Sequence, residues 1–316
     1  MKKVFIYIIF MFSLLSIKLY AQQDQEPHYT QFLFNKMVIN PAFTGLKENW
    51  DFGVFYRNQW ARMNGAPENI LFNIQHGLSN QKLGLGGYIM NDKIGLENRL
   101  NTFFSGAYHI KRENDIFSLG LQCGIRAFFL NSSELDPKDK DDAALYSGFK
   151  NPVTPDFKFG FNYMHKDFYA GFSISHLNQS KFRYAYNLDQ SNLKRHYYIN
   201  AGYNYVIDPV YTLKPSVMLR WVPGTKVVGD VCAVIDYSKK YWAGLNFRSK
   251  DAIGFIIGIN LDNFEAIKYD MKIGYAYDYT LSSVRNKLGN SHEIMITYNP
   301  KKVEKKHTQK FQRLEF

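Results

Sequence analysis

Apolar and polar residues alternate with a period of two along most of the chain. The segment 268–279 shows this most clearly, because Tyr, Met and Ile occupy one face while Lys, Asp, Gly and Ala occupy the other. After residue 21, no segment keeps an apolar stripe at the period of a helix. The alternation predicts 14 strands, at 50–60, 68–78, 82–92, 97–111, 115–130, 155–165, 167–177, 194–207, 210–221, 228–237, 240–248, 252–262, 268–280 and 290–298.

Each predicted strand has one face suited to lipid and one suited to a watery interior, as in membrane barrels. The sequence therefore predicts an all-β protein, a transmembrane antiparallel up-and-down β-barrel of about 14 strands. Twelve or sixteen strands would also close such a barrel. Pro215 fits its strand worst, because proline cannot donate to the ladder, and we expect a bulge or a register break there.

The connections between the predicted strands alternate in length. Outer-membrane barrels have short periplasmic turns and longer extracellular loops. With an even strand number, this pattern places both chain termini in the periplasm. The short turns are 79–81, 112–114, 166, 208–209, 238–239 and 263–267, and the long loops are 131–154, 178–193 and 281–289.

The start of the chain has the layout of a secretory signal peptide. Lys2 and Lys3 precede an apolar run from Val4 to Leu15, and the sequence turns polar after Ala21. The run is shorter than the roughly 20 residues that a membrane-spanning helix needs. We expect cleavage after Ala21, with an uncleaved membrane anchor as the alternative.

The signal peptide at 1–21 is the first of four expected parts of the chain. The next, 22–48, is too apolar for a free linker, and we expect it to line or plug the barrel lumen. The barrel itself then occupies 49–299. Residues 300–316 form a basic tail, which we expect in the periplasm.

Composition agrees with a membrane barrel. Aromatic residues make up 17% of the chain, which suits an apolar outer band with aromatic girdles. The net charge of +11 owes part of its excess to the tail. Because the chain carries an export signal, acidic lipid headgroups or an acidic protein partner are favoured over nucleic acid.

Candidate chemistry is sparse, and the sequence predicts no enzyme, metal site or cofactor. Cys123 and Cys232 could pair only if the fold brings them together, and otherwise they are small strand side chains. The Asp-rich loop 131–154 lacks the ligand order of a calcium loop, so a solvated surface is favoured. The histidines form no serine-hydrolase or zinc motif, although spacing alone leaves a site assembled across strands open.

Charged residues also fall on the less apolar faces of the strands. They have two interpretations: paired charges that fill a narrow lumen, which is favoured, or a polar permeation path. The residues are Arg126, Lys214, Arg220, Asp230, Asp236, Arg248, Asp270, Lys272, Asp278 and Glu293.

Several short motifs are spread over the chain after residue 21. The first two are QEPHYTQFLFN at 25–35 and NPAFTG at 40–45. The later motifs are YRNQW at 56–60, LGLGGYIMNDKIG ending at Gly95, PDFKFG at 155–160, SKDAIG at 249–254, GYAYDY at 274–279 and GNSHEI at 289–294. Together they resemble the PorP/SprF family of type IX secretion proteins in Bacteroidetes, and the first two resemble the opening of the family, with Phe43 where Tyr is usual. The resemblance covers nearly the whole chain after residue 21, without the basic tail.

The resemblance implies an outer-membrane component of type IX secretion and gliding motility, which supports secretion or surface attachment of an adhesin-like partner. It implies a secreted partner with a type IX sorting domain on the outer face, and periplasmic lipoprotein or peptidoglycan-binding components on the inner face. The motif positions to which it gives a structural or partner-binding role are Tyr29, Gln31, Phe32, Asn35, Asn40, Pro41, Gly45, Arg57, Gln59, Trp60, Asp156, Asp251, Asp278, His292 and Glu293.

Two other functions remain open from the sequence. The barrel pattern alone fits an outer-membrane channel for small or hydrophobic solutes equally well. A barrel lipase or protease is a further possibility that no motif supports.

Overall fold

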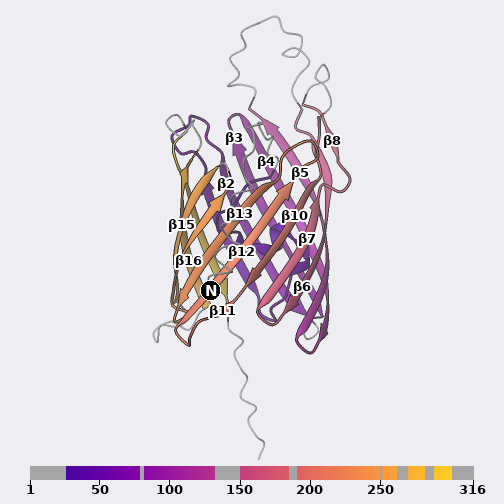
Figure 1. The fold of residues 1–316 in the computed structure, drawn as a ribbon. Helices are drawn as coiled ribbons and strands as arrows, with labels where there is room; N and C mark the ends of the chain where they lie inside the picture. The colour runs from indigo at the N-terminus through magenta and orange to yellow at the C-terminus, as the bar shows by residue number, and fades with distance from the viewer. Residues whose placement is uncertain are drawn as a thin grey trace, which may run out of the picture.

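Fourteen antiparallel strands close into a barrel in the computed structural model of the chain (Figure 1). The structure describes residues 26–78, 82–131, 150–184, 191–249, 251–261, 270–281 and 288–300. The strands are β1 (Asp51–Asn58), β2 (Glu68–Leu78), β3 (Leu83–Ile94), β4 (Glu97–Arg112), β5 (Asp115–Leu130), β6 (Val153–His165), β7 (Phe168–Ser175), β10 (His196–Tyr203) with its continuation β11 (Tyr205–Val206), β12 (Tyr211–Trp221), β13 (Val228–Tyr237), β14 (Tyr241–Arg248), β15 (Ala252–Asn260), β16 (Asp270–Thr280) and β17 (Ser291–Asn299).

Strands that follow one another in the chain pair with one another, and β1 pairs with β17 to close the barrel. Between β7 and β10, the short strands β8 (Lys181–Phe182) and β9 (Ser191–Asn192) form a separate ribbon. The predicted barrel and its strand number are confirmed. No helix in the described part of the chain is long and apolar enough to cross a membrane.

We name the two ends of the barrel by their connections. The short-turn end carries the turns at 113–114, 166–167 and 238–240, and the long-loop end carries the chain between β5 and β6 and between β7 and β10. The predicted signal peptide, the tail after residue 300, two short turns and the middles of the three long loops lie outside the described residues.

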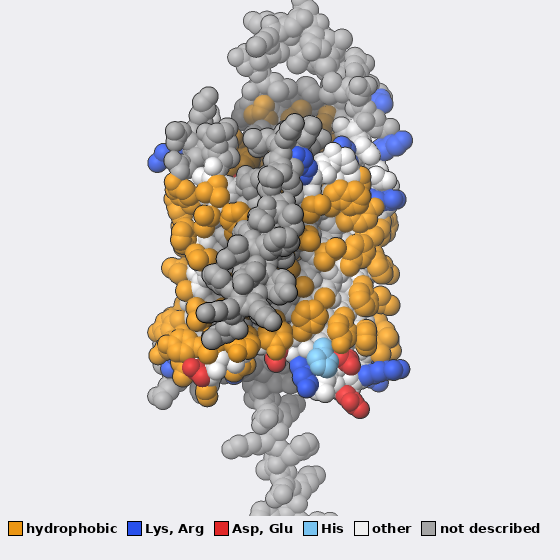
Figure 2. Space-filling view, in the orientation of Figure 1, with side chains coloured by type: hydrophobic (Ala, Val, Ile, Leu, Met, Phe, Trp, Pro, Cys, Tyr) orange, Lys and Arg blue, Asp and Glu red, His pale blue; other side chains and the backbone are white. Residues whose placement is uncertain are grey.

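The alternation of residues places apolar side chains on the outer wall. In β16, Ile273, Tyr275 and Tyr279 are exposed, whereas Ala276 and Asp278 are buried inside. Figure 2 shows hydrophobic side chains over the middle of the visible face and charged ones gathered at its two ends. This apolar band is the surface that lipid covers in outer-membrane barrels.

Tyrosines concentrate on the outer wall at the short-turn end. Tyr211 lies beside Tyr237, with ring centroids 5.3 Å apart, and Tyr237 lies 6.5 Å from Tyr241. All three are exposed. Amphipathic rings prefer the headgroup level, so these tyrosines mark one membrane interface.

The prediction of a bulge or register break at Pro215 is wrong. Pro215 lies opposite Ala233 in the unbroken pairing of β12 with β13. On the other side of β12, pairing stops after Ser216 and resumes at Leu213 in the same register. The missing N–H of proline is accommodated by a short gap in one ladder, because the strand can stay extended without that bond.

Candidate functional site

Residues 26–48, which we call the luminal segment, lie inside the barrel. The segment folds into three short helical turns, η1 (Phe32–Phe34), α2 (Lys36–Ile39) and η2 (Pro41–Phe43). Asn40 separates α2 from η2, and its side-chain oxygen accepts a hydrogen bond from the backbone of η2 at 3.0 Å. Pro41 at the first position of η2 also favours the start of a new helical turn there, because the fixed φ of proline suits the first residue of a helix.

The Asn40 side chain also fastens the luminal segment to the barrel wall. Its amide nitrogen donates to the carbonyl oxygens of Phe161 in β6, at 3.0 Å, and of Phe172 in β7, at 3.4 Å. A Cβ atom at Gly160 would lie 2.0 Å from the Asn40 side-chain oxygen. The wall therefore carries glycine at the point where Asn40 reaches it.

Other glycines of the wall face the backbone of the luminal segment in the same way. A Cβ at Gly120 would lie 2.3 Å from the nitrogen of Ala42, and one at Gly84 would lie 1.9 Å from the carbonyl oxygen of Thr44. Real Cβ atoms do not approach other atoms so closely. Because glycine permits this approach, the barrel interior is shaped to its own N-terminal segment.

A cluster around Arg57 binds the segment through charge. Glu293 accepts hydrogen bonds from the backbone nitrogens of Thr30, at 2.8 Å, and Gln31, at 2.9 Å. Asp278 accepts from the Thr30 hydroxyl at 2.7 Å. Arg57 donates to Asp278 at 2.8 Å and to Glu293 at 3.1 Å, so one guanidinium neutralises both carboxylates.

Neighbouring strands extend this cluster. Arg248 donates to Asp230 at 2.8 Å and to Asp251 at 3.2 Å. The Arg220 guanidinium lies 2.6 Å from the Nδ1 atom of His28, at the start of the luminal segment. These contacts agree with the interpretation of paired charges that fill the lumen.

A second cluster surrounds Glu26. Arg126 contacts the Glu26 carboxylate and also donates to Asp156 at 2.8 Å. Lys158 lies 3.5 Å from Glu26, and His176 lies 2.8 Å from Asp156. Burial raises the pKa of Glu26, but the nearby Arg126, Lys158 and His176 outweigh it and hold the pKa well below 4.5.

The Glu26 cluster also contains possible metal ligands. Glu26, Asp156 and His176 offer ligand atoms that lie within 4.8 Å of one another. However, Arg126 and Lys158 already neutralise the two carboxylates, and a divalent cation there would meet two positive charges. The cluster is explained by its role in holding the first residues of the luminal segment.

One histidine and serine lie together in the lumen. His109 Nδ1 lies 2.8 Å from the Ser118 hydroxyl, and its Nε2 lies 2.9 Å from the carbonyl oxygen of Thr44. Both side chains are buried, and the luminal segment covers them at Thr44. This pair fastens Thr44 to β4 and β5.

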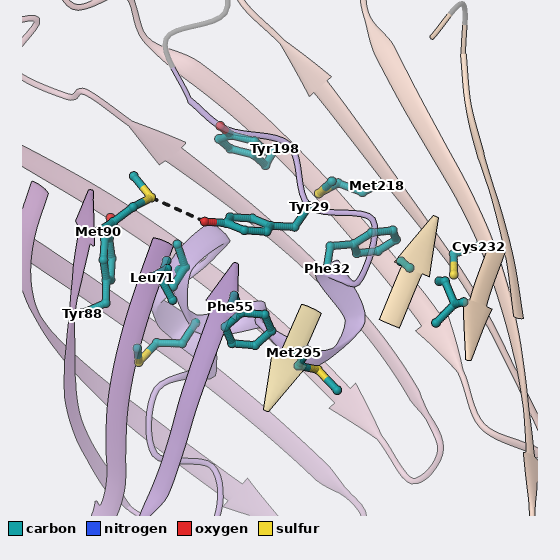
Figure 3. Close-up of a cluster of buried hydrophobic side chains, with 14 of the residues drawn as sticks. Tyr29, Phe32, Phe55, Leu71, Tyr88, Met90, Tyr198, Met218, Cys232 and Met295 are labelled. Carbon is teal, nitrogen blue, oxygen red and sulfur yellow. Dashed lines mark hydrogen bonds between the residues drawn. The ribbon is translucent and has the colours of Figure 1, made fainter. Parts of the chain in front are cut away.

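Apolar contacts complete the anchoring (Figure 3). The Tyr29 ring packs edge-on against Phe55, and its hydroxyl contacts Asn69 and the sulfur of Met90. The inward faces of the strands were expected to be polar, and the apolar cluster corrects that prediction for this part of the lumen. The buried apolar cluster includes Tyr29, Phe32, Met37, Val38, Phe55, Leu71, Tyr88, Met90, Phe103, Tyr198, Met218, Cys232, Val234, Trp242, Ile256 and Met295.

Two chambers flank the luminal segment. The one near the long-loop end has a volume of about 250 Å³, and Arg57, Gln59 and Trp60 line it. The one near the short-turn end has a volume of about 400 Å³, and Lys36 and Lys272 line it.

The structure brings most of the family-motif positions together in the lumen. Within the luminal segment, these are Tyr29, Gln31, Phe32, Asn35, Asn40, Pro41 and Gly45. On the wall, Arg57, Asp278 and Glu293 form one cluster, Asp156 belongs to the other, and Asp251 pairs with Arg248. His292 is the exception, because its ring lies 2.7 Å from the Tyr275 hydroxyl on the outer wall.

Sequence reasoning missed several anchoring residues. Glu26, Thr30, Lys158 and His176 were not candidates, although each contacts a buried charge. Lys158 carried a weak signal, because it is a charge between the phenylalanines of a predicted strand. Glu26 and Thr30 carried none, since their partners lie on distant strands.

The fold and the site define a class of protein, an outer-membrane β-barrel whose lumen is filled by its own N-terminal segment. The chain belongs to the PorP/SprF family: residues 21–298 match the family described as type IX secretion system membrane protein PorP/SprF. It is thus an outer-membrane protein of a type IX secretion family. The family and fold are those of a membrane barrel component and not those of an enzyme.

No curated protein matches the sequence. Among solved structures, the toluene transporter TbuX of Ralstonia pickettii is similar, with 10% identity over 84% of this chain and 92% of its own, and a TM-score of 0.49. The toluene transporter TodX of P. putida has 6% identity over 83% and 92%, with a TM-score of 0.48. An outer membrane protein of Acinetobacter baumannii has 7% identity over 81% and 100%, with a TM-score of 0.47.

Proposed function

We propose that this barrel supports the secretion or surface attachment of an adhesin-like partner by the type IX system of a gliding member of the Bacteroidetes. The family match supports a role in type IX secretion. The observation that carries the proposal further is the filled lumen: the luminal segment is held by two charge clusters and by wall glycines. A barrel built around its own segment is suited to docking partners at its ends.

The proposal includes a direction across the membrane. Short turns face the periplasm and longer loops face outward in known outer-membrane barrels. β17 ends at the short-turn end, so the tail that follows it is proposed to be periplasmic. Glu26 lies near the long-loop end beside Asp156 and His176, so the proposal of a periplasmic N-terminus rests on the even strand number alone. Cleavage of a signal peptide after Ala21 would then leave the luminal segment at the new N-terminus.

Each end of the barrel is assigned a different partner. The loops around 131–154 and 178–193 would meet a secreted partner that carries a type IX sorting domain. The short turns and the basic tail would meet periplasmic lipoprotein or peptidoglycan-binding components, while lipid surrounds the wall. Crosslinkers placed in the tail should capture periplasmic proteins, and capture of extracellular proteins alone would reverse the assignment.

Deletion of the gene followed by surface and medium proteomics tests the function. We expect at least one secreted adhesin-like protein to disappear from the surface, and to return on complementation with the unaltered gene. Complementation with a G106A variant serves as a matched control, because this substitution adds a methyl group to the outer wall with its nearest contact at 4.0 Å. Unchanged surface and secreted proteins in the deletion strain would defeat the proposal.

A further inference from the structure

The chamber at the short-turn end, with its volume of about 400 Å³, has an unusual charge. Lys36 projects to it from α2, Lys272 from β16, and Lys47 from the end of the luminal segment. Asp51 is the acidic residue that lines the chamber, and it already pairs with Lys47 at 3.7 Å. The chamber therefore holds more positive than negative groups.

Lys36 is the residue that distinguishes this chamber. Its ammonium lies 3.7 Å from the centroid of the Tyr169 ring and 5.4 Å from that of Phe43. Aromatic faces attract a cation but do not neutralise its charge. Within the part of the chain that the structure describes, no carboxylate lies within ion-pair distance of Lys36.

Burial, together with the nearby Lys47 and Lys214, lowers the pKa of Lys36 from 10.5 to about 8. A desolvated ammonium without a counter-ion is costly, and two other lysines that face the lumen have acidic partners. Lys158 lies 3.5 Å from Glu26, and Lys214 lies 2.9 Å from Asp236. These surroundings are those expected of a cation that binds an anionic ligand.

The rest of the chamber wall is largely apolar. Leu33, Phe34, Met37 and Met164 line it beside Lys36. A free phosphate or sulfate ion would make no use of these side chains. An apolar body joined to a negative group would cover them and bring its charge to the ammonium.

We propose that the short-turn chamber binds a carboxylate carried on an apolar body, with the Lys36 ammonium as its counter-ion. The volume lies within the usual range of small-ligand pockets, roughly 300–1,000 Å³, so it suits a chain end and not a folded domain. Two sources share this chemistry, namely the C-terminal residues of an apolar peptide and a short fatty acid. The proposal stands apart from the secretion partner, because it concerns one chamber and its ligand.

Calorimetry on the purified full-length protein tests the proposal. The probes are N-acetyl-leucyl-phenylalanine and hexanoate, each with its uncharged counterpart, the peptide amide and hexanol, and inorganic phosphate as a purely ionic probe. We expect at least one of the two carboxylates to bind at pH 7, and the peptide and hexanoate arms show which source the chamber prefers. Binding of neither carboxylate, equal binding of the uncharged counterpart, or phosphate binding as tight as the carboxylate would overturn the proposal.

Substitutions at Lys36 separate this site from general attraction to a basic protein. K36M should weaken carboxylate binding at least about tenfold, the scale of one lost charge-assisted hydrogen bond, whereas K36R should retain it. K181M is the matched control, because Lys181 is an exposed lysine of β8 that does not line the chamber, and it should change affinity less than about threefold. Unaltered affinity in K36M would overturn the assignment.

The number of protons taken up on binding gives a second measurement. Near pH 8 the free Lys36 is partly neutral, and a bound carboxylate should restore its proton. Calorimetry in two buffers of different ionisation enthalpy should therefore show that binding takes up protons, and K36M should abolish this uptake. The other titratable groups around Lys36 are Tyr169, which its ammonium contacts, and the nearby Lys47 and Lys214. Asp236 pairs with Lys214, and Asp51, Asp270 and Lys272 lie together at the chamber. A proton uptake that persists in K36M would assign the proton to one of these groups and defeat the proposal.

Discussion

At the scale of single residues, the lumen depends on charges that neutralise one another. Arg57 stands between two buried carboxylates, Asp278 and Glu293, and both also hold the luminal segment. A buried charge without a partner is costly. Removing one member of a buried ion pair therefore destabilises the fold by more than the intact pair stabilises it. Stability should therefore respond strongly to the loss of one partner.

We expect R57M to lower the free energy of unfolding by about 3–5 kcal/mol, because it removes the cation that pairs with Glu293 and leaves Asp278 with Arg248 alone, at 3.5 Å. Urea unfolding in lipid vesicles, followed by the shift in electrophoretic migration, measures this change. D115N is the control, because Asp115 pairs with His165 at the exposed rim and should cost no more than about 1 kcal/mol. Equal effects of the two variants would contradict the role given to Arg57.

The pKa of Glu26 predicts a dependence of stability on pH. Because the folded protein holds this pKa well below 4.5, the ionised carboxylate stabilises the fold at neutral pH. This contribution should begin to fall as the pH drops below about 4.5 and should be lost once the pH passes the lowered pKa. E26Q should flatten this acid part of the stability curve, whereas E113Q, at an exposed turn, should leave it unchanged.

At the scale of elements, the wall and the luminal segment fit each other through glycine. G120A would place a methyl group against the backbone of Ala42 and should displace the luminal segment, whereas G106A adds the same methyl group to the outer wall. We expect G120A to make Lys36 accessible to trypsin in the folded barrel. If G120A and G106A are cleaved at the same rate as the parent, the fit is not required.

At the scale of the whole molecule, the filled lumen should oppose the flow of ions. We expect the intact protein to show no large, stable conductance in planar bilayers, because the luminal segment is anchored around Glu26, Arg57 and Asn40. Deletion of residues 26–45 should produce an open channel if the strands still close. A large conductance of the unaltered protein would favour a solute channel over a docking barrel.

Most of the fold was predictable, because its strands follow from patterns among residues that are close in the sequence. Strand alternation depends on neighbouring residues, so the strands of the barrel could be placed to within a few residues. The expected break at Pro215 was wrong, because a strand can lose one bond to a neighbour and keep its register. The site was only half predictable, since Arg57, Asp278 and Glu293 were named but their common partner, Thr30, was not.

The sequence by itself determined the barrel, its strand number, its apolar outer band and its family. These follow from a period of two and from motifs that are each continuous in the chain. Only the tertiary structure decided what fills the lumen, because contacts such as Thr30 with Glu293 join residues from opposite ends of the chain. It also showed how the charges of the lumen form two buried clusters, and it revealed an apolar core around Tyr29 and Phe32 and a chamber in which no carboxylate of the described residues lies within ion-pair distance of Lys36. Closure of the barrel brings these residues together, and no local pattern records which distant strand faces which part of the segment.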